Sequence, residues 1–268
     1  MDFINDSNHF DQHFLIDDNI IYSFIDVSKF NSSDIVVEVG PGKGTLTSLI
    51  ARKVKKLYCI EVDLRLKPYL DEICRKNNNV DIIYSNVLNV DIPICNKIIT
   101  SLPYSIIEPF MNKMIKTNFD ELIMITGNKF ASSVENNEIS YLSLLTNCFF
   151  DIEKIMEIYP ESFNPKPHTM SAMIKLKHKD NDDNIINSFF KNMFLLNHKK
   201  AKNGIIESFI ATGYCSTQRE ARELIKIMNI SNDLLETKFE IYSNDQLLNL
   251  YESVKKLFDG KNRYRISK

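Results

Sequence analysis

The sequence predicts an α/β protein, in which a doubly wound, mostly parallel sheet is followed by a small C-terminal helical domain. Through residue 180, short apolar runs alternate with segments of helical periodicity, which is the order expected of a parallel sheet covered by helices. Beyond residue 184 only helical periodicity remains. The polar stretch KDNDDN at residues 179–184 reads as a linker. We therefore expect two domains, residues 1–179 and 180–268.

Five apolar runs supply the expected parallel strands. The first, residues 35–37, leads into a glycine-rich turn, and the second, residues 57–60, ends at Glu61. Residues 45–54 between them have helical spacing. The other three runs cover residues 80–84, 97–100 and 121–125. Because ligands of such sheets bind outside the carboxyl ends of the strands, we look for the functional site at that edge.

The remaining elements are an antiparallel edge and a set of helices. Residues 149–159 and 171–176 look like strands that flank a proline-rich turn, and we expect them on the edge of the same sheet. Apolar stripes at helical spacing then predict helices around residues 185–193, 205–210 and 247–258.

The composition is that of an ordinary globular chain. No apolar stretch is long enough to span a bilayer, and the polar, acidic start differs from a secretory signal, so we expect a cytoplasmic protein with no membrane partner. The five cysteines form no CxxC pair and the five histidines are dispersed, so we expect no metal site.

The net charge of −2 is unevenly distributed. Residues 1–180 carry 19 basic and 24 acidic side chains, whereas the remainder carries 14 and 11. Local basic clusters at residues 175–179, 198–202 and 261–268 could follow a phosphate backbone, although a solvated face explains such clusters more commonly.

The turn Glu-Val-Gly-Pro-Gly-Lys-Gly at residues 38–44 contains three of the seven glycines, Gly40, Gly42 and Gly44. Glycines let a ligand approach the backbone, and the following helix offers free amides. Glu61, about 20 residues later, is placed to accept both hydroxyls of a ribose. The spacing GxGxG fits neither the GxGxxG of dinucleotide enzymes nor a GK[ST] phosphate loop, so we expect S-adenosylmethionine. Taken alone, the glycines fit a simple tight loop equally well.

A second motif, Ser101-Leu102-Pro103-Tyr104, follows the fourth strand and so lies at the same sheet edge. Methyl transfer to an adenine amine requires that the nitrogen lone pair be freed from the ring, and acceptors that hold the amine hydrogens favour this geometry. The Ser101 hydroxyl and a backbone carbonyl can serve. Tyr104 can stack on an extruded base, a contact worth about 1–3 kcal/mol.

Five strings occur in order along the chain: DQHFLID at 11–17, EVGPGKGTLT at 38–47, IEVD at 60–63, SLPY at 101–104, and FNPKP at 163–167 followed by Ser171. Together they resemble the ribosomal RNA adenine dimethyltransferases, the KsgA and Erm family, over nearly the whole chain. The first and last strings are most similar to archaeal members. The resemblance implies an S-adenosylmethionine-dependent methyltransferase that acts on two adjacent adenosines near the 3′ end of small-subunit rRNA. It also implies docking on the pre-ribosomal small subunit. A monomer would suit such docking, and we therefore expect one.

The resemblance implies cofactor contacts for individual residues. His13 and Leu15 would touch the cofactor from a segment that closes over the site. Gly40 would lie beneath the methionine part and Glu61 would hold the ribose. Asn86 stands where the family usually has an acid that recognises the adenine amine of the cofactor. Its amide oxygen still accepts a hydrogen bond, so this change is expected to weaken binding without abolishing it.

The base-binding side departs further from the family. Ser101 replaces the usual asparagine, and its hydroxyl is shorter than an amide. Phe163 would form the second face of a base clamp with Tyr104, or it is an ordinary core aromatic ahead of a turn. These departures leave two alternatives open: a weak or inactive RNA-binding assembly factor, and a methyltransferase redirected to another RNA or nucleobase.

Overall fold

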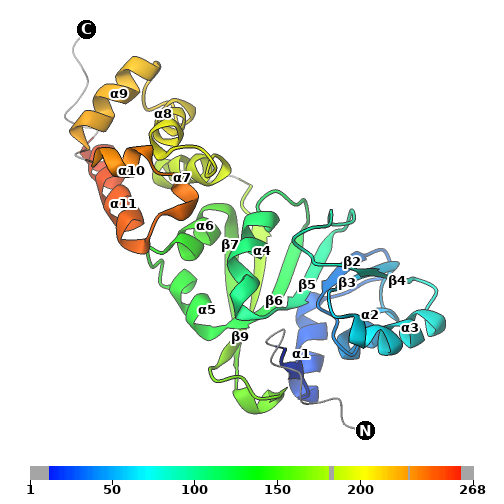
Figure 1. Ribbon diagram of the computed structural model, residues 1–268. Coiled ribbons are helices and arrows are strands. Elements are labelled where there is room, and N and C mark those ends of the chain that lie inside the picture. Colours follow the sequence, from blue (N-terminus) through cyan, green and yellow to red (C-terminus); the bar gives the residue numbers. More distant parts are fainter. Residues whose placement is uncertain (1–11, 181–183, 229, 261–268) are drawn as a thin grey trace. The chain divides into compact units, whose positions relative to one another are not determined.

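The computed structural model describes residues 12–180, 184–228 and 230–260. These residues form two compact units, one within Met1–Glu135 and Asp151–His178 and the other within Asn136–Phe150 and Lys179–Lys268 (Figure 1). The last crossing between the units falls next to the boundary expected at residue 179. The stretch 136–150, expected in the first domain, groups instead with the helical unit. Whether the units are independent domains stays a prediction.

A mostly parallel sheet organises the first unit. In the part of the chain that the structure describes, it has seven strands in the order β4-β3-β2-β5-β6-β9-β7. Strands β2 to β6 pair in parallel and β9 runs antiparallel to β6. Their bounds are β2 Ile35–Val39, β3 Lys56–Glu61, β4 Val80–Tyr84, β5 Lys97–Ser101, β6 Glu121–Gly127, β7 Phe150–Ile158 and β9 Ser171–His178. The predicted fold class is confirmed, and all five expected parallel strands are present.

The helices of the first unit connect these strands. They are α1 Asp18–Ser28, α2 Thr45–Ile50, α3 Lys67–Lys76, α4 Ile107–Met114 and α5 Asn128–Glu135, with short 3-10 turns at Leu64–Leu66, Tyr104–Ile106 and Pro160–Ser162. Helix α2 is shorter than the helix expected over residues 45–54. Its final turn tightens, because Lys53 N donates to Ile50 O at 2.8 Å. Val54 is buried, but it lies after this turn and outside the helix.

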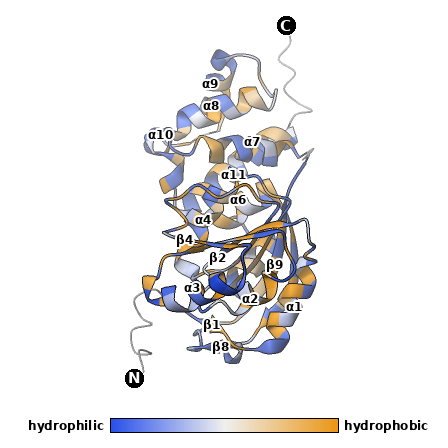
Figure 2. Ribbon diagram, turned by 90° about the vertical axis from the view of Figure 1, so that its right-hand side faces the viewer, coloured by the Kyte–Doolittle hydropathy of each residue, from blue (hydrophilic) through white to orange (hydrophobic). Residues whose placement is uncertain are grey.

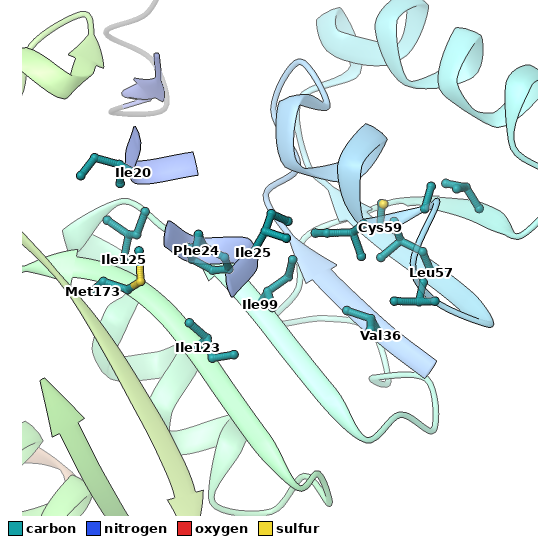
Figure 3. Close-up of a cluster of buried hydrophobic side chains, with 14 of the residues drawn as sticks. Ile20, Phe24, Ile25, Val36, Leu57, Cys59, Ile99, Ile123, Ile125 and Met173 are labelled. Carbon is teal, nitrogen blue, oxygen red and sulfur yellow. The ribbon is translucent and has the colours of Figure 1, made fainter. Parts of the chain in front are cut away.

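A hydrophobic cluster lies between α1, α2 and the sheet. Phe24 of α1 is fully buried, and Ile99, Ile123 and Met173 come from three adjacent strands. Figure 3 shows these side chains gathered around α1. Hydrophobic residues concentrate in the strands, whereas the helices carry mixed surfaces (Figure 2). Burial of this kind is the main term that stabilises the fold, at about 25 cal/mol per Å² of apolar surface.

A small two-stranded sheet joins two sequence motifs that lie about 150 residues apart. Strand β1, Phe14–Leu15, pairs antiparallel with β8, Phe163–Asn164. Ile16 N extends this contact by donating to Ser162 O at 2.8 Å. The sequence predicted neither strand, because each is only two residues long and the pairing is non-local. The proline-rich turn is therefore tied to the N-terminal segment.

The second unit consists of helices packed around aromatic rings. They are α6 Tyr141–Phe149, α7 Ile185–Leu195, α8 Ala201–Ala211, α9 Gln218–Ile227, α10 Asn232–Glu236 and α11 Asn244–Asp259, with a 3-10 turn at Phe239–Ile241. Tyr141 and Phe149 of α6 pack on Phe194 of α7, with ring centroids 5.1 and 6.5 Å apart. This contact explains why 136–150 groups with the later helices. No helix in the described residues is both long and apolar enough for a membrane span.

Candidate active site

A cavity of about 550 Å³ opens at the carboxyl ends of β2, β3 and β5, within the first unit. Its walls come from the glycine turn, the ends of the neighbouring strands, the N-terminal segment and the proline-rich turn. It brings together nearly every residue that the sequence singled out: His13, Leu15, Gly40, Gly42, Glu61, Asn86, Ser101, Leu102, Pro103, Tyr104 and Phe163. Gly44 is not among the lining residues. The arrangement matches the rule that such sheets bind ligands where their strands end.

The glycine turn is built from left-handed backbone that side chains disfavour. Gly42 has φ +60°, and a Cβ there would lie 3.1 Å from the ring of Phe14. Gly44 has φ +83°, and a Cβ there would clash with Cδ1 of Ile73 on α3. Gly44 thus permits close packing of the turn against α3. The structure gives it this packing role, and cofactor contact at Gly44 stays a prediction.

Two buried carboxylates line the cavity. Glu61 is 3% exposed, and its side chain accepts from the backbone amides of Asp63 at 2.8 Å and Gly42 at 3.2 Å. Glu38 is also 3% exposed and accepts from Thr47 Oγ1 at 2.7 Å. Burial raises the pKa of Glu61, and burial raises the pKa of Glu38 to about 7. Such a site favours a ligand that carries hydroxyl donors and positive charge.

Glu38 is a site residue that the sequence analysis did not select. Glu38 is the first residue of the glycine motif, in which only the glycines were predicted to contact the cofactor. An acid inside the otherwise apolar strand IVVEV is unusual, since buried carboxylates are costly. This unusual position is the signal in the sequence by which Glu38 could be identified.

Asn86 lies in the loop after β4 and is exposed to solvent while it lines the cavity. Its Oδ1 accepts from Leu88 N at 2.9 Å, which holds the loop in place. An amide oxygen has two lone pairs, so one remains for a ligand. A carboxylate here could use one oxygen for Leu88 and the other for the ligand.

The SLPY motif turns the chain from β5 into the cavity. Ser101 is the last residue of β5, and Leu102 is buried against the glycine turn, 3.7 Å from where a Cβ of Gly40 would lie. Tyr104 is 37% exposed, and its hydroxyl lies 2.6 Å from Oγ of Ser171. Ser171 was noted in the sequence only as part of a motif, because nothing local indicates this contact.

Phe163 is compatible with both interpretations that the sequence left open, namely a core aromatic and one face of a base clamp. It is 3% exposed and belongs to the hydrophobic cluster that includes Phe24 and Met173. It also lines the cavity. Its part in a base clamp therefore stays a prediction.

The N-terminal segment covers the cavity through contacts with the proline-rich turn. Nδ1 of His13 lies 2.7 Å from Pro165 O, and Ser162 Oγ donates to Asp17 Oδ2 at 3.0 Å. Lys43 of the glycine turn lies 5.2 Å from the ring centroid of Phe14. The first residue of the DQHFLID string, Asp11, lies outside the described residues.

Comparison with known proteins identifies the family. The family model described as "Ribosomal RNA adenine dimethylase" matches residues 4–211. The chain belongs to the ribosomal RNA adenine dimethylase family. The resemblance inferred from five sequence strings is thereby confirmed.

Curated relatives of the dimethylase family agree with this result. "Probable ribosomal RNA small subunit methyltransferase A" of Methanococcus maripaludis (strain C6) is 36% identical over 194 residues, which are 68% of this chain and 74% of the relative. The protein of the same name from Pyrococcus abyssi is 34% identical over 198 residues, or 71% and 72% of the two chains.

Solved structures show the same fold as this dimethylase family member. A dimethyladenosine transferase from Plasmodium falciparum has a TM-score of 0.63 at 20% identity, and the match covers 91% of this chain and 98% of that one. The 23S rRNA methyltransferase ErmE has a TM-score of 0.60 at 19% identity, with coverage of 90% and 99%. Each match is longer than the first unit alone and therefore includes part of the second unit.

Proposed function

We propose that this chain transfers methyl groups from S-adenosylmethionine to the exocyclic amines of two adjacent adenosines near the 3′ end of small-subunit rRNA. The observation that carries the proposal is a single cavity that unites the glycine turn and Glu61 with Ser101 and Tyr104. Family membership supports methylation of rRNA adenine. The small subunit as target is supported by the names of the relatives from Methanococcus and Pyrococcus.

The cavity fits the cofactor on chemical grounds. The carboxylate of Glu61 can accept from two ribose hydroxyls while its backbone amide donors hold it in place. Glu38 adds a buried carboxylate that would face positive charge. When bound, S-adenosylmethionine supplies a methyl group on a positively charged sulfur. Gly40 lines the cavity with φ +71°, a backbone conformation that side chains disfavour, and it places no Cβ between the backbone and a ligand.

The residues of SLPY would prepare the target amine. Ser101 Oγ and the carbonyl oxygen of Leu102 would accept the two amine hydrogens, which frees the nitrogen lone pair for in-line attack on the methyl carbon. Tyr104 would stack on the extruded adenine. As the nitrogen–carbon bond forms, the carbon–sulfur bond would break with its electron pair left on the sulfur, which departs as a neutral thioether. The nitrogen would then lose one proton to solvent.

The basic clusters that could follow a phosphate backbone are partly neutralised. Lys199 pairs with Glu207 at 2.9 Å, and Lys200 pairs with Glu236 at 2.7 Å. The cluster at residues 261–268 lies outside the described residues. We propose that RNA contact depends on the particle's shape as well as on charge, with a cytoplasmic monomer docking on the pre-ribosomal small subunit.

A mutation at Glu61 tests the cofactor assignment. We expect Glu61→Ala to weaken S-adenosylmethionine binding about 100-fold or more, because each of the two hydrogen bonds to this charged acceptor contributes about 1.5–3 kcal/mol. Titration calorimetry measures this affinity. Glu157→Ala, at an exposed position near the end of β7, is the control and should leave this affinity unchanged. Unaltered binding by Glu61→Ala would refute the assignment.

The reaction is tested with unmethylated small ribosomal subunits and S-adenosylmethionine carrying a labelled methyl group. Mass spectrometry of the RNA should identify dimethyladenosine at two adjacent positions. Methylation of a different nucleotide would refute the target. Absence of transfer, together with measurable cofactor and subunit binding, would support the assembly-factor alternative. The methyltransferase names of the relatives do not favour that alternative.

A further inference from the structure

The ring of Tyr104 is held by two groups from outside the SLPY motif. Its hydroxyl lies 2.6 Å from Ser171 Oγ. A Cβ on Gly127 would lie 3.5–3.6 Å from Cγ, Cδ1 and Cε1 of the ring. Nearly equal distances to three atoms of one ring place that point over the ring face. The backbone of Gly127 therefore covers one face of Tyr104 and leaves the opposite face for a ligand.

The sheet fixes the position of Ser171. It is the first residue of β9 and pairs with Gly127, the last residue of β6, in the antiparallel register. Ser171 is 2% exposed and lines the cavity. Both neighbours of the Tyr104 ring belong to the β6–β9 strand pair. The same part of the sheet therefore fixes the position of the Tyr104 hydroxyl and of the covered ring face.

A tyrosine without such contacts would be free to tilt. Tyr104 is 37% exposed and begins a three-residue 3-10 turn, so its own segment gives it little packing. Displacement of a reacting group by about 1 Å can cost about a hundredfold in rate. A stacking platform that tilts would move the amine of a stacked base by a comparable distance.

We propose that Ser171 is a positioning residue for the target base. By holding the hydroxyl of Tyr104, it fixes the plane on which the extruded adenine stacks and so directs the amine toward Ser101. This inference rests on the proposed function, in which Tyr104 is the stacking platform. Ser171 touches Tyr104 and not the reacting atoms.

Ser171→Ala, Tyr104→Phe and the double variant test this role. Each single variant removes the same hydrogen bond, so we expect each to lower kcat for methylation of small subunits about 3- to 10-fold. The double variant should lose no more than either single variant. Calorimetry should show unchanged affinity for S-adenosylmethionine in all three, a separation that general loss of structure would not give.

Ser28→Ala is the matched control, since Ser28 is fully buried and its hydroxyl donates to Phe24 O at 2.7 Å. It should keep the wild-type kcat below its melting temperature. Wild-type kcat in Ser171→Ala, or losses that multiply in the double variant, would overturn the inference. Absence of adenine methylation by the wild-type protein would instead overturn the proposed function, and it is measured first.

Discussion

The chemistry of the proposed active site depends on the reach of single side chains. Ser101 ends β5 at the cavity, three residues before the Tyr104 platform. An asparagine oxygen extends further from the backbone and can accept the same amine hydrogen with less displacement of the base. The difference concerns the acceptor substrate and leaves the cofactor contacts untouched.

We therefore expect Ser101→Asn to raise kcat for adenine methylation about 2- to 10-fold. This increase corresponds to the net free energy of one neutral hydrogen bond. The affinity for S-adenosylmethionine should stay the same. Ser33→Asn, on an exposed turn, serves as the control substitution. Initial rates with small subunits measure the effect. A lower kcat in Ser101→Asn would mean that the hydroxyl is matched to a different acceptor geometry.

Glu38 couples stability to pH. Burial raises its pKa to about 7, above the ordinary value of 4.5. Between these values the folded chain binds more protons than the unfolded chain, so stability from this group is present below about pH 4.5 and is lost as pH rises through about 7. We expect Glu38→Gln, which keeps an acceptor for Thr47, to be more stable than wild type at pH 8 by about 1–3 kcal/mol.

Urea unfolding at pH 5 and pH 8 measures this difference. At pH 5 the two proteins should have similar free energies of unfolding, because Glu38 is then mostly protonated in the folded chain. Glu153→Gln, at an exposed position, controls for the loss of one carboxylate from the chain. A constant difference between Glu38→Gln and wild type at both pH values would contradict the raised pKa.

At the scale of elements, the β1–β8 pair joins two segments that line the cavity. One is the N-terminal segment, which we expect to contact the cofactor, and the other carries Phe163. Ile16 is 56% exposed, and its amide donates to Ser162 O. Replacing it with proline removes this donor without removing core packing. The preceding residue, Leu15, is already extended, as a residue before proline must be.

We expect Ile16→Pro to loosen β1 and to weaken S-adenosylmethionine binding about 3- to 10-fold, because one backbone hydrogen bond is worth about 1 kcal/mol. Ile16→Ala keeps the amide and provides the matched control. Calorimetry and proteolysis of the N-terminal segment measure the two effects. Equal affinities of the proline and alanine variants would show that this bond does not support the cofactor site.

Elements with strong local patterns could be predicted from the sequence, and those that depend on distant partners could not. The run 80–84 is found unchanged as β4, because its apolar residues alone predict a strand. Strand β8 requires β1 as its partner, and α6 belongs with α7 through ring contacts. The cavity followed from motif positions at strand ends, whereas the Tyr104–Ser171 contact depends on the antiparallel placement of β9.

At the scale of the whole molecule, the compact units do not follow a single cut in the chain. Helix α6 precedes β7 in sequence, yet its buried Tyr141 and Phe149 pack on Phe194. Tyr141 also contacts Phe239, with ring centroids 6.0 Å apart. A fragment that ends at residue 179 retains α6 but lacks these partners.

We expect the fragment 1–179 to expose the apolar face of α6. Large apolar patches exposed in this way favour association, so the fragment should bind a hydrophobic dye and aggregate at concentrations where the full chain does not. Replacing Tyr141 and Phe149 in the fragment with serine should reduce dye binding, since each removes exposed ring surface. Fluorescence titration and light scattering measure both properties. A fragment that stays monomeric, binds no dye and melts cooperatively like the full chain would show that residues 136–150 belong with the sheet, because their apolar side chains would then be covered without the later helices.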